Sequence, residues 1–186
     1  MLITETAAGA PTDDNVVMKN LAYVSHALVM SPDHLTPMAV SNIPETEFAW
    51  LRSRVMPGFC YDNAWLTANH LGAAGVVLGA ALVNIGGHQI PVEHAWVWDG
   101  GDRYYDPTYQ LLDEAHQGRL NATSYYGLIR LSMDEYLAFA EECSNPLPNL
   151  IAVDVVQFRR HPRFSHLFKR CSVNRKHAPE DSKRGT

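Results

Sequence analysis

Cys60, His94 and Asp106 are three residues whose types and order could build a nucleophilic site. Cys60 follows Pro57-Gly58 and opens a segment that predicts a helix. Its thiol would then lie at a helix N-terminus, where the backbone dipole favours the thiolate, and its amide would point to where an oxyanion forms. His94 and then Asp106 follow in chain order. A thiol, an imidazole and a carboxylate can act together as nucleophile, base and orienting group.

The pairing of His94 with Asp106 depends on the register of a hairpin. If residues 99–101, Asp-Gly-Gly, form a three-residue loop, Trp98 pairs with Asp102 and His94 faces Asp106 directly. Directly opposed residues have Cβ atoms about 4.5–5.5 Å apart, close enough for a hydrogen bond that fixes the tautomer of the imidazole and stabilises the imidazolium. A two-residue loop would instead send the two side chains to opposite faces. The sequence permits the pair without requiring it.

Flanking patterns predict the elements that would position these groups. Asn42-Ile43-Pro44-Glu45 is typical of a helix start, with Asn42 as N-cap, and predicts a helix over 43–55. A second helix is expected over 61–71, ended by Gly72. The other patterns predict strands over 75–85, 89–98, 103–106 and 150–158, and helices over 133–142 and 163–171.

The bulk composition is that of one folded domain. The chain has 186 residues, 46% of them hydrophobic and 19% charged, without an apolar run of the ~20 residues that a membrane helix needs. Its first residues lack the basic and apolar regions of a secretory signal, so we expect a cytoplasmic protein, with signal-less export left open. The odd cysteine count argues against a disulfide framework. We expect a disordered stretch over 1–15, a domain over 16–172 and a basic disordered tail over 173–186.

Charge is distributed unevenly along the chain. Residues 159–186 contain nine Lys or Arg and two acidic residues, whereas the whole chain carries a net charge of −5. This pattern predicts a solvated tail, or one that lies on its own acidic body or binds an acidic partner or membrane surface. Nucleic acid is a poorer fit as a partner, because the aromatic residues of this segment are Phe164 and Phe168.

Two blocks of sequence resemble the transglutaminase-like branch of the papain-like thiol enzymes. Gly58-Phe59-Cys60-Tyr61-Asp62-Asn63-Ala64 is similar to the family's Gly-x-Cys-x-x-x-Ala motif, and His94-Ala95-Trp96 with Asp106-Pro107-Thr108 is similar to its second block. The resemblance covers residues 43–110. It implies Cys60 as nucleophile, His94 as base and Asp106 as orienting group. It also implies an α+β, papain-like fold, in which a helix carrying the Cys packs on an antiparallel sheet carrying His and Asp.

The expected function is thiol-dependent acyl chemistry on a protein or peptide amide, without a cofactor. Hydrolysis by a protease or amidase is expected first. Transglutaminase-type transfer or deamidation of a protein Gln is an alternative, and a catalytically silent binding module on the same scaffold is another. A metal site is disfavoured, because Cys60, His70, His88 and His94 show no tight ligand spacing. Two departures from the family leave the substrate class open: a shorter His-to-Asp connection, and Tyr61 where many members have Trp.

Residues that could bind the substrate are harder to choose. The second oxyanion donor could be Asn42 or Trp50, although Asn42 could instead cap a helix and Trp50 could be a core residue. Tyr61 follows the nucleophile and is a further candidate for contact with the substrate. Trp96 shares the His94 face and would wall an acyl groove if exposed, or belong to the core if buried.

Overall fold

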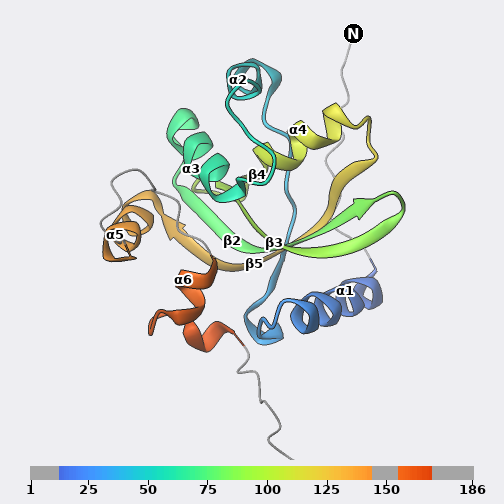
Figure 1. The fold of residues 1–186 in the computed structure, drawn as a ribbon, viewed down its shortest axis with the longest axis vertical. Coiled ribbons are helices and arrows are strands. Elements are labelled where there is room, and N and C mark those ends of the chain that lie inside the picture. Colours follow the sequence, from blue (N-terminus) through green and yellow to red (C-terminus); the bar gives the residue numbers. More distant parts are fainter. Residues whose placement is uncertain (1–12, 144–154, 169–186) are drawn as a thin grey trace, which may run out of the picture.

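The computed structural model describes residues 13–143 and 155–168, which form a mixed α+β fold around a five-stranded antiparallel sheet. The strand order is β1-β5-β2-β3-β4 (Figure 1). The strands are β1 (Thr36–Met38), β2 (Gly75–Ile85), β3 (His88–Trp98), β4 (Tyr104–Tyr105) and β5 (Leu120–Ser132). The helices are α1 (Asp14–Ala27), α2 (Glu45–Leu51), α3 (Cys60–Leu71), α4 (Pro107–Ala115), α5 (Met133–Cys143) and α6 (Val155–Arg160), with 3₁₀ turns η1 (Pro32–His34) and η2 (Ser165–Leu167).

A long hairpin of β2 and β3 forms the centre of the sheet. Ile85 pairs with His88 around a Gly-Gly turn, and the pairing continues without a break to Gly75 opposite Trp98. Residues 75–83 of β2 are all buried, because this strand lies between β3 and β5 and is covered on both faces. Such a strand tolerates a continuous run of Val, Leu and Ala. The predicted strands over 75–85 and 89–98 are confirmed.

The side chains of β2 alternate between two hydrophobic clusters. Val76, Leu78 and Leu82 belong to a large cluster that also contains residues of α1, α5 and α6. Val77 and Trp96 belong to a smaller cluster on the other face. Figure 1 shows α1 and α6 on one side of the sheet and α2 and α4 on the other. The sheet is therefore sandwiched, and its smaller cluster supports the face that carries His94.

Helix α3 packs along β3 and begins at Cys60, one residue before the start that the sequence predicts. Ala64 and Ala68 are buried in the large cluster, and their small side chains let the helix approach closely. Gly72, in the left-handed conformation with φ of 60°, ends the helix as expected. The helix thus holds the thiol at one end of a rigid, buried element.

The first predicted helix is shorter than expected and begins two residues later. Helix α2 covers Glu45–Leu51 rather than 43–55, and Pro44, not Asn42, occupies its N-cap position. The Ile43 amide and carbonyl are bonded instead by the side chain of Gln110, from α4. These two hydrogen bonds hold Ile43 outside the helix. Because Gln110 is 67 residues away in sequence, no local pattern predicts this contact.

The C-terminal segment closes the large cluster. The expected strand over 150–158 is wrong for residues 155–158, which lie in α6, and residues 150–154 fall outside the described residues. Helix α5 and its capping box are confirmed by reciprocal bonds between Ser132 and Glu135. Of the helix expected over 163–171, the described residues contain only the 3₁₀ turn η2, and residues 169–171 lie outside them. Arg159 forms an ion pair with Glu93, and Arg163 with Glu135, so this part of the basic segment lies on the acidic body.

Helix α1 is the N-terminal element of the described residues. Helix α1 begins at Asp14, before the expected domain start at 16, and Asp13 caps it by accepting a bond from the Asn15 amide. Residues 1–12, the tail over 173–186 and Cys171 lie outside the described residues.

Cys60 and Cys143 carry free thiols. Within residues 13–143 and 155–168, the helices lack the combination of length and apolar character required to cross a membrane.

Candidate active site

His94 and Asp106 are in contact, although not through the register that the sequence predicts. His94 Nε2 lies 2.7 Å from Asp106 Oδ2. Strand β4 pairs Val97 with Tyr105 and Trp98 with Tyr104, so the predicted pairing of Trp98 with Asp102 is wrong. The loop contains residues 99–103, not 99–101. Because the register differs by two residues, the side chains keep the same face, and the contact survives.

The longer loop is closed by Asp99. The Asp99 amide donates to the Arg103 carbonyl at 3.1 Å, while the Asp99 carboxylate accepts from the Gly101 amide and from the Arg103 guanidinium. These bonds favour five loop residues over three. The hairpin therefore ends in β4, only two residues long, and Asp106 follows it directly.

Asp106 is the N-cap of α4, and four donors surround its carboxylate. Oδ1 accepts from the Thr108 and Tyr109 amides at 2.9 and 3.2 Å. Oδ2 accepts from the Tyr125 hydroxyl at 2.8 Å and faces His94. The residue is 3% exposed. An Asp before Pro suits a helix start, where the free backbone amides and the helix dipole favour the charged carboxylate.

His94 is 2% exposed and is surrounded by aromatic rings. The Tyr109 ring lies 4.7 Å from the imidazole, between centroids, and those of Trp96 and Tyr125 lie 6.2 and 6.4 Å away. Burial lowers the pKa of His94, but the Asp106 carboxylate and a hydrogen bond with Cys60 raise it, and the net pKa lies above the ordinary value of 6.5. The site therefore favours the imidazolium despite its burial.

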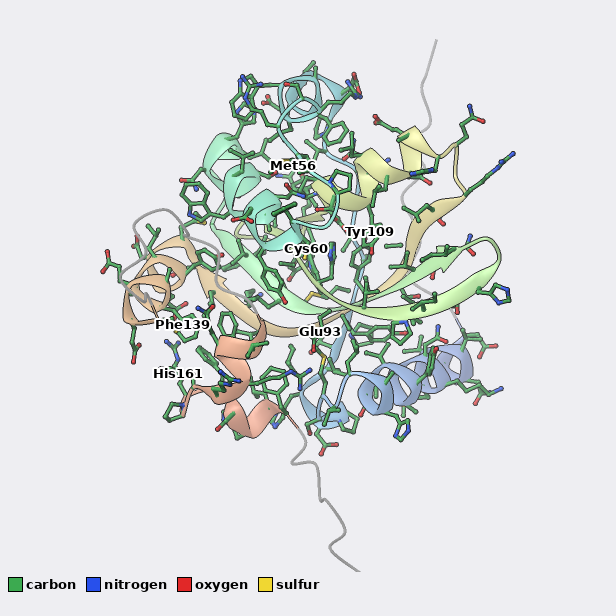
Figure 2. All side chains as sticks on the ribbon, viewed as in Figure 1. Met56, Cys60, Glu93, Tyr109, Phe139 and His161 are labelled. Atoms are coloured by element: carbon green, nitrogen blue, oxygen red, sulfur yellow. The ribbon has the colours of Figure 1, made fainter. Side chains whose placement is uncertain are left out.

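Cys60 is the first residue of α3 and is partly exposed. Gly58, with φ of 84°, turns the chain into the helix, a conformation that suits glycine. Phe59 occupies the N-cap position and has no side-chain acceptor, so its side chain cannot cap the amides of the first turn. Figure 2 shows Cys60 and Tyr109 together on one side of β3, away from Glu93. His94 shares the Cys60 side, because neighbouring strand residues alternate.

Several residues around this trio were not anticipated. Tyr125 lies on β5, which the sequence patterns did not predict, and burial and the Asp106 charge raise its pKa well above 10.0, so it remains a hydrogen-bond donor. Asn63, buried at 2% exposure on α3, bonds Thr108 on α4. The signal for Asn63 was weak but present: Asn is unfavourable inside a helix unless its amide has specific partners.

The candidate oxyanion donors are not brought to Cys60. Trp50 is 39% exposed and stacks on His70, with ring centroids 4.1 Å apart. His70 lies ten residues along α3 from Cys60, about 15 Å at 1.5 Å per residue. Asn42 lines a cavity of about 370 Å³ whose walls include Asp106 but not Cys60. Trp50 therefore lies at the end of α3 away from the thiol, and Asn42 lines a cavity that Cys60 does not line.

The two candidate substrate contacts also differ in position. Trp96 is 0% exposed and lies in the core beside Tyr125, with ring centroids 5.3 Å apart, so it cannot wall an open groove. Tyr61 is half-buried and packs against the large cluster, adjacent to Cys60 in sequence. The residues with exposed apolar surface close to Cys60 in sequence are Met56 and Phe59.

Comparisons with protein-family models, with curated proteins and with solved structures find no match for this chain. In the part of the chain that the structure describes, no three His, Cys, Asp or Glu side chains gather in a way that could hold a metal ion.

Proposed function

We propose that this chain is a cysteine hydrolase that cleaves an amide through a thioester, with Cys60 as nucleophile, His94 as base and Asp106 as orienting group. The observation that carries the proposal is the 2.7 Å contact of His94 with Asp106, together with the position of Cys60 close enough to His94 to raise the pKa of the imidazole. Asp106 occupies Nε2 of the ring, so Nδ1 is the nitrogen left to exchange a proton with Cys60. This orientation suits proton exchange with the thiol and the leaving group.

The reaction would proceed in two balanced halves. The Cys60 thiolate attacks the amide carbonyl, a C–S bond forms, and the carbonyl π electrons move to oxygen, near the Cys60 amide. Collapse of this intermediate breaks the C–N bond, and His94 donates its Nδ1 proton to the departing amine. Water then attacks the thioester while His94 takes a proton from it. The C–S bond breaks, a carboxylic acid leaves, and the thiolate–imidazolium pair is restored.

The resemblance of the motifs supports the same assignment. Gly58–Ala64 supplies the nucleophile block, and the segments beginning at His94 and Asp106 supply the second. The arrangement of α3 along an antiparallel strand that carries the histidine fits a papain-like, transglutaminase-like core, and we include that core in the proposal.

Hydrolysis is the outcome that solvent access favours. Cys60 is partly exposed, and Phe59 beside it is 51% exposed. Water can therefore reach a thioester at Cys60, whereas transfer to an amine requires that water be kept out.

The test is the pH dependence of Cys60 alkylation by iodoacetamide, measured in a background with Cys143→Ser and Cys171→Ser. We expect rapid alkylation well below pH ~8.5, at which a free cysteine is half ionised. His94→Ala should lose this low-pH reactivity. His70→Ala, at the far end of α3, is the matched control and should keep it. Slow alkylation that His94→Ala leaves unchanged would overturn the proposal and favour a catalytically silent binding module.

A further inference from the structure

We propose that Asn63 and Thr108 form a positioning bridge that holds the Cys60 thiol against the His94–Asp106 pair. The inference rests on the proposed function, because it assigns a role relative to that catalytic trio. The bridge joins α3, which carries the nucleophile, to α4, which begins at the orienting carboxylate. Neither residue is expected to touch the substrate, so both are positioning rather than catalytic residues.

Asn63 first fixes the segment that leads into the nucleophile. Its Oδ1 accepts from the Met56 amide at 3.0 Å, and its Nδ2 donates to the Met56 carbonyl at 2.7 Å. This two-point contact closes the turn of residues 56–59 immediately before Cys60. Asn63 also lies three residues after Cys60, so the two share one face of α3. The amide therefore constrains both the approach to Cys60 and the helix that carries it.

The second proton of the same amide reaches the other half of the site. Asn63 Nδ2 donates to Thr108 Oγ1 at 2.9 Å, and the Thr108 amide donates to Asp106 Oδ1 at 2.9 Å. Thr108 is 3% exposed, so these bonds are shielded from water. Both N–H donors of the Asn63 amide and its oxygen form hydrogen bonds. A buried amide with every group bonded fixes the position of the segments that it joins.

The bridge matters because the three reacting groups come from three elements. Cys60 starts α3, His94 lies in β3, and Asp106 starts α4. The bond between His94 and Asp106 fixes the imidazole to α4, but it does not fix the thiol. A thiolate–imidazolium pair requires hydrogen-bond distance, and a shift of one ångström between helices would weaken it. The Asn63–Thr108 bond is a direct polar link between those helices near the site.

The experiment compares Thr108→Val with Thr108→Ser by the pH profile of Cys60 alkylation, in the Cys143→Ser, Cys171→Ser background. Thr108→Val preserves shape but removes the acceptor, and we expect alkylation at pH 6 to fall by about tenfold per folded molecule, because the thiol is then held less closely against His94. Thr108→Ser restores an acceptor and should recover most of the low-pH rate. Asn63→Ala should lose at least as much as Thr108→Val.

Ser25→Ala is the matched control for stability alone. The Ser25 hydroxyl is buried and donates to the Met30 carbonyl at 2.7 Å, on α1 and outside the site. It should lower the denaturant midpoint without changing the pH profile. If Thr108→Val behaves like Ser25→Ala, the bridge is structural only and the inference is overturned, while the proposed function stands. If the wild type itself lacks low-pH alkylation, the proposed function fails and the positioning role fails with it.

Discussion

His94 and Asp106 are diagonal neighbours across β3 and β4, not directly opposed residues. Extending the pairing of Val97 with Tyr105 by one step places Trp96 opposite Asp106, with His94 two residues further along β3. Diagonal neighbours on one face are about 7–8 Å apart at the backbone, within reach of long side chains. The turn of the chain into α4 at Asp106 helps to bring the carboxylate to 2.7 Å from the imidazole. The pair therefore does not require one particular loop length. It requires only that the register differ from the predicted one by an even number of residues, which keeps both side chains on one face.

Asp106→Asn should damage both the fold and the reactivity of Cys60. All four contacts of this carboxylate are with groups that can donate. An amide must place its NH₂ either against the Thr108 and Tyr109 amides or against His94 and Tyr125, and neither orientation satisfies every partner. We expect the free energy of unfolding to fall by about 2–4 kcal/mol, measured by urea denaturation. Alkylation of Cys60 at pH 6 should fall at least tenfold.

Asp113→Asn is the matched control for that substitution. Asp113 lies on the same helix, and its Oδ1 is buried with no hydrogen-bond partner among the described residues. The variant should be as stable as the wild type or slightly more stable, because an amide costs less to bury than a carboxylate. An Asp106→Asn protein that matched Asp113→Asn in both stability and alkylation would contradict a role for the Asp106 carboxylate.

The parts of the site that sequence could predict are those set by local chemistry. Pro57-Gly58 predicts the start of α3 to within one residue, and Asp106-Pro107 contains the signals of a helix N-terminus that the structure uses for α4. The contact of His94 with Asp106 followed from a hairpin argument. The loop length was wrong because it depends on the Asp99 side chain, which closes five residues where the glycines alone suggested three.

The parts that sequence could not predict depend on distant contacts. Tyr125 lies on β5, where register shifts against β2 between Leu78 and Gly79 and between Leu82 and Val83 break the regular alternation of buried and exposed residues. Asn42 met the local criteria for an N-cap, but Gln110 on α4 bonds its neighbour Ile43 instead. In both cases the outcome depends on a contact with a residue far away in the sequence, which local sequence patterns do not contain.

The stability of the protein should depend on pH through His94. Its folded-state pKa is raised above 6.5, because Asp106 and Cys60 outweigh the opposing effect of burial. Protonated His94 therefore stabilises the fold, fully below pH ~6.5 and progressively less as pH rises through the raised value. We expect the wild type to lose about 2 kcal/mol relative to His94→Gln across this window. Urea denaturation from pH 5 to pH 10 measures the difference, and one that stayed constant or grew with pH would show that His94 is buried neutral.

Gly79→Ala should be among the most damaging small substitutions in the sheet. Gly79 pairs with His94, and a Cβ added there would lie 2.1 Å from the Tyr126 carbonyl oxygen and 3.0 Å from Trp96 Cη2. Backbone at that distance must move, and Trp96 lies close to the imidazole. We expect the free energy of unfolding to fall by about 3 kcal/mol, with slower Cys60 alkylation at pH 6. Gly101→Ala is the control: its Cβ would lie no closer than 3.6 Å to its neighbours, so stability should change by less than about 0.5 kcal/mol. Equal stability and equal alkylation of the two variants would show that β2 can shift away from β5 without disturbing the site.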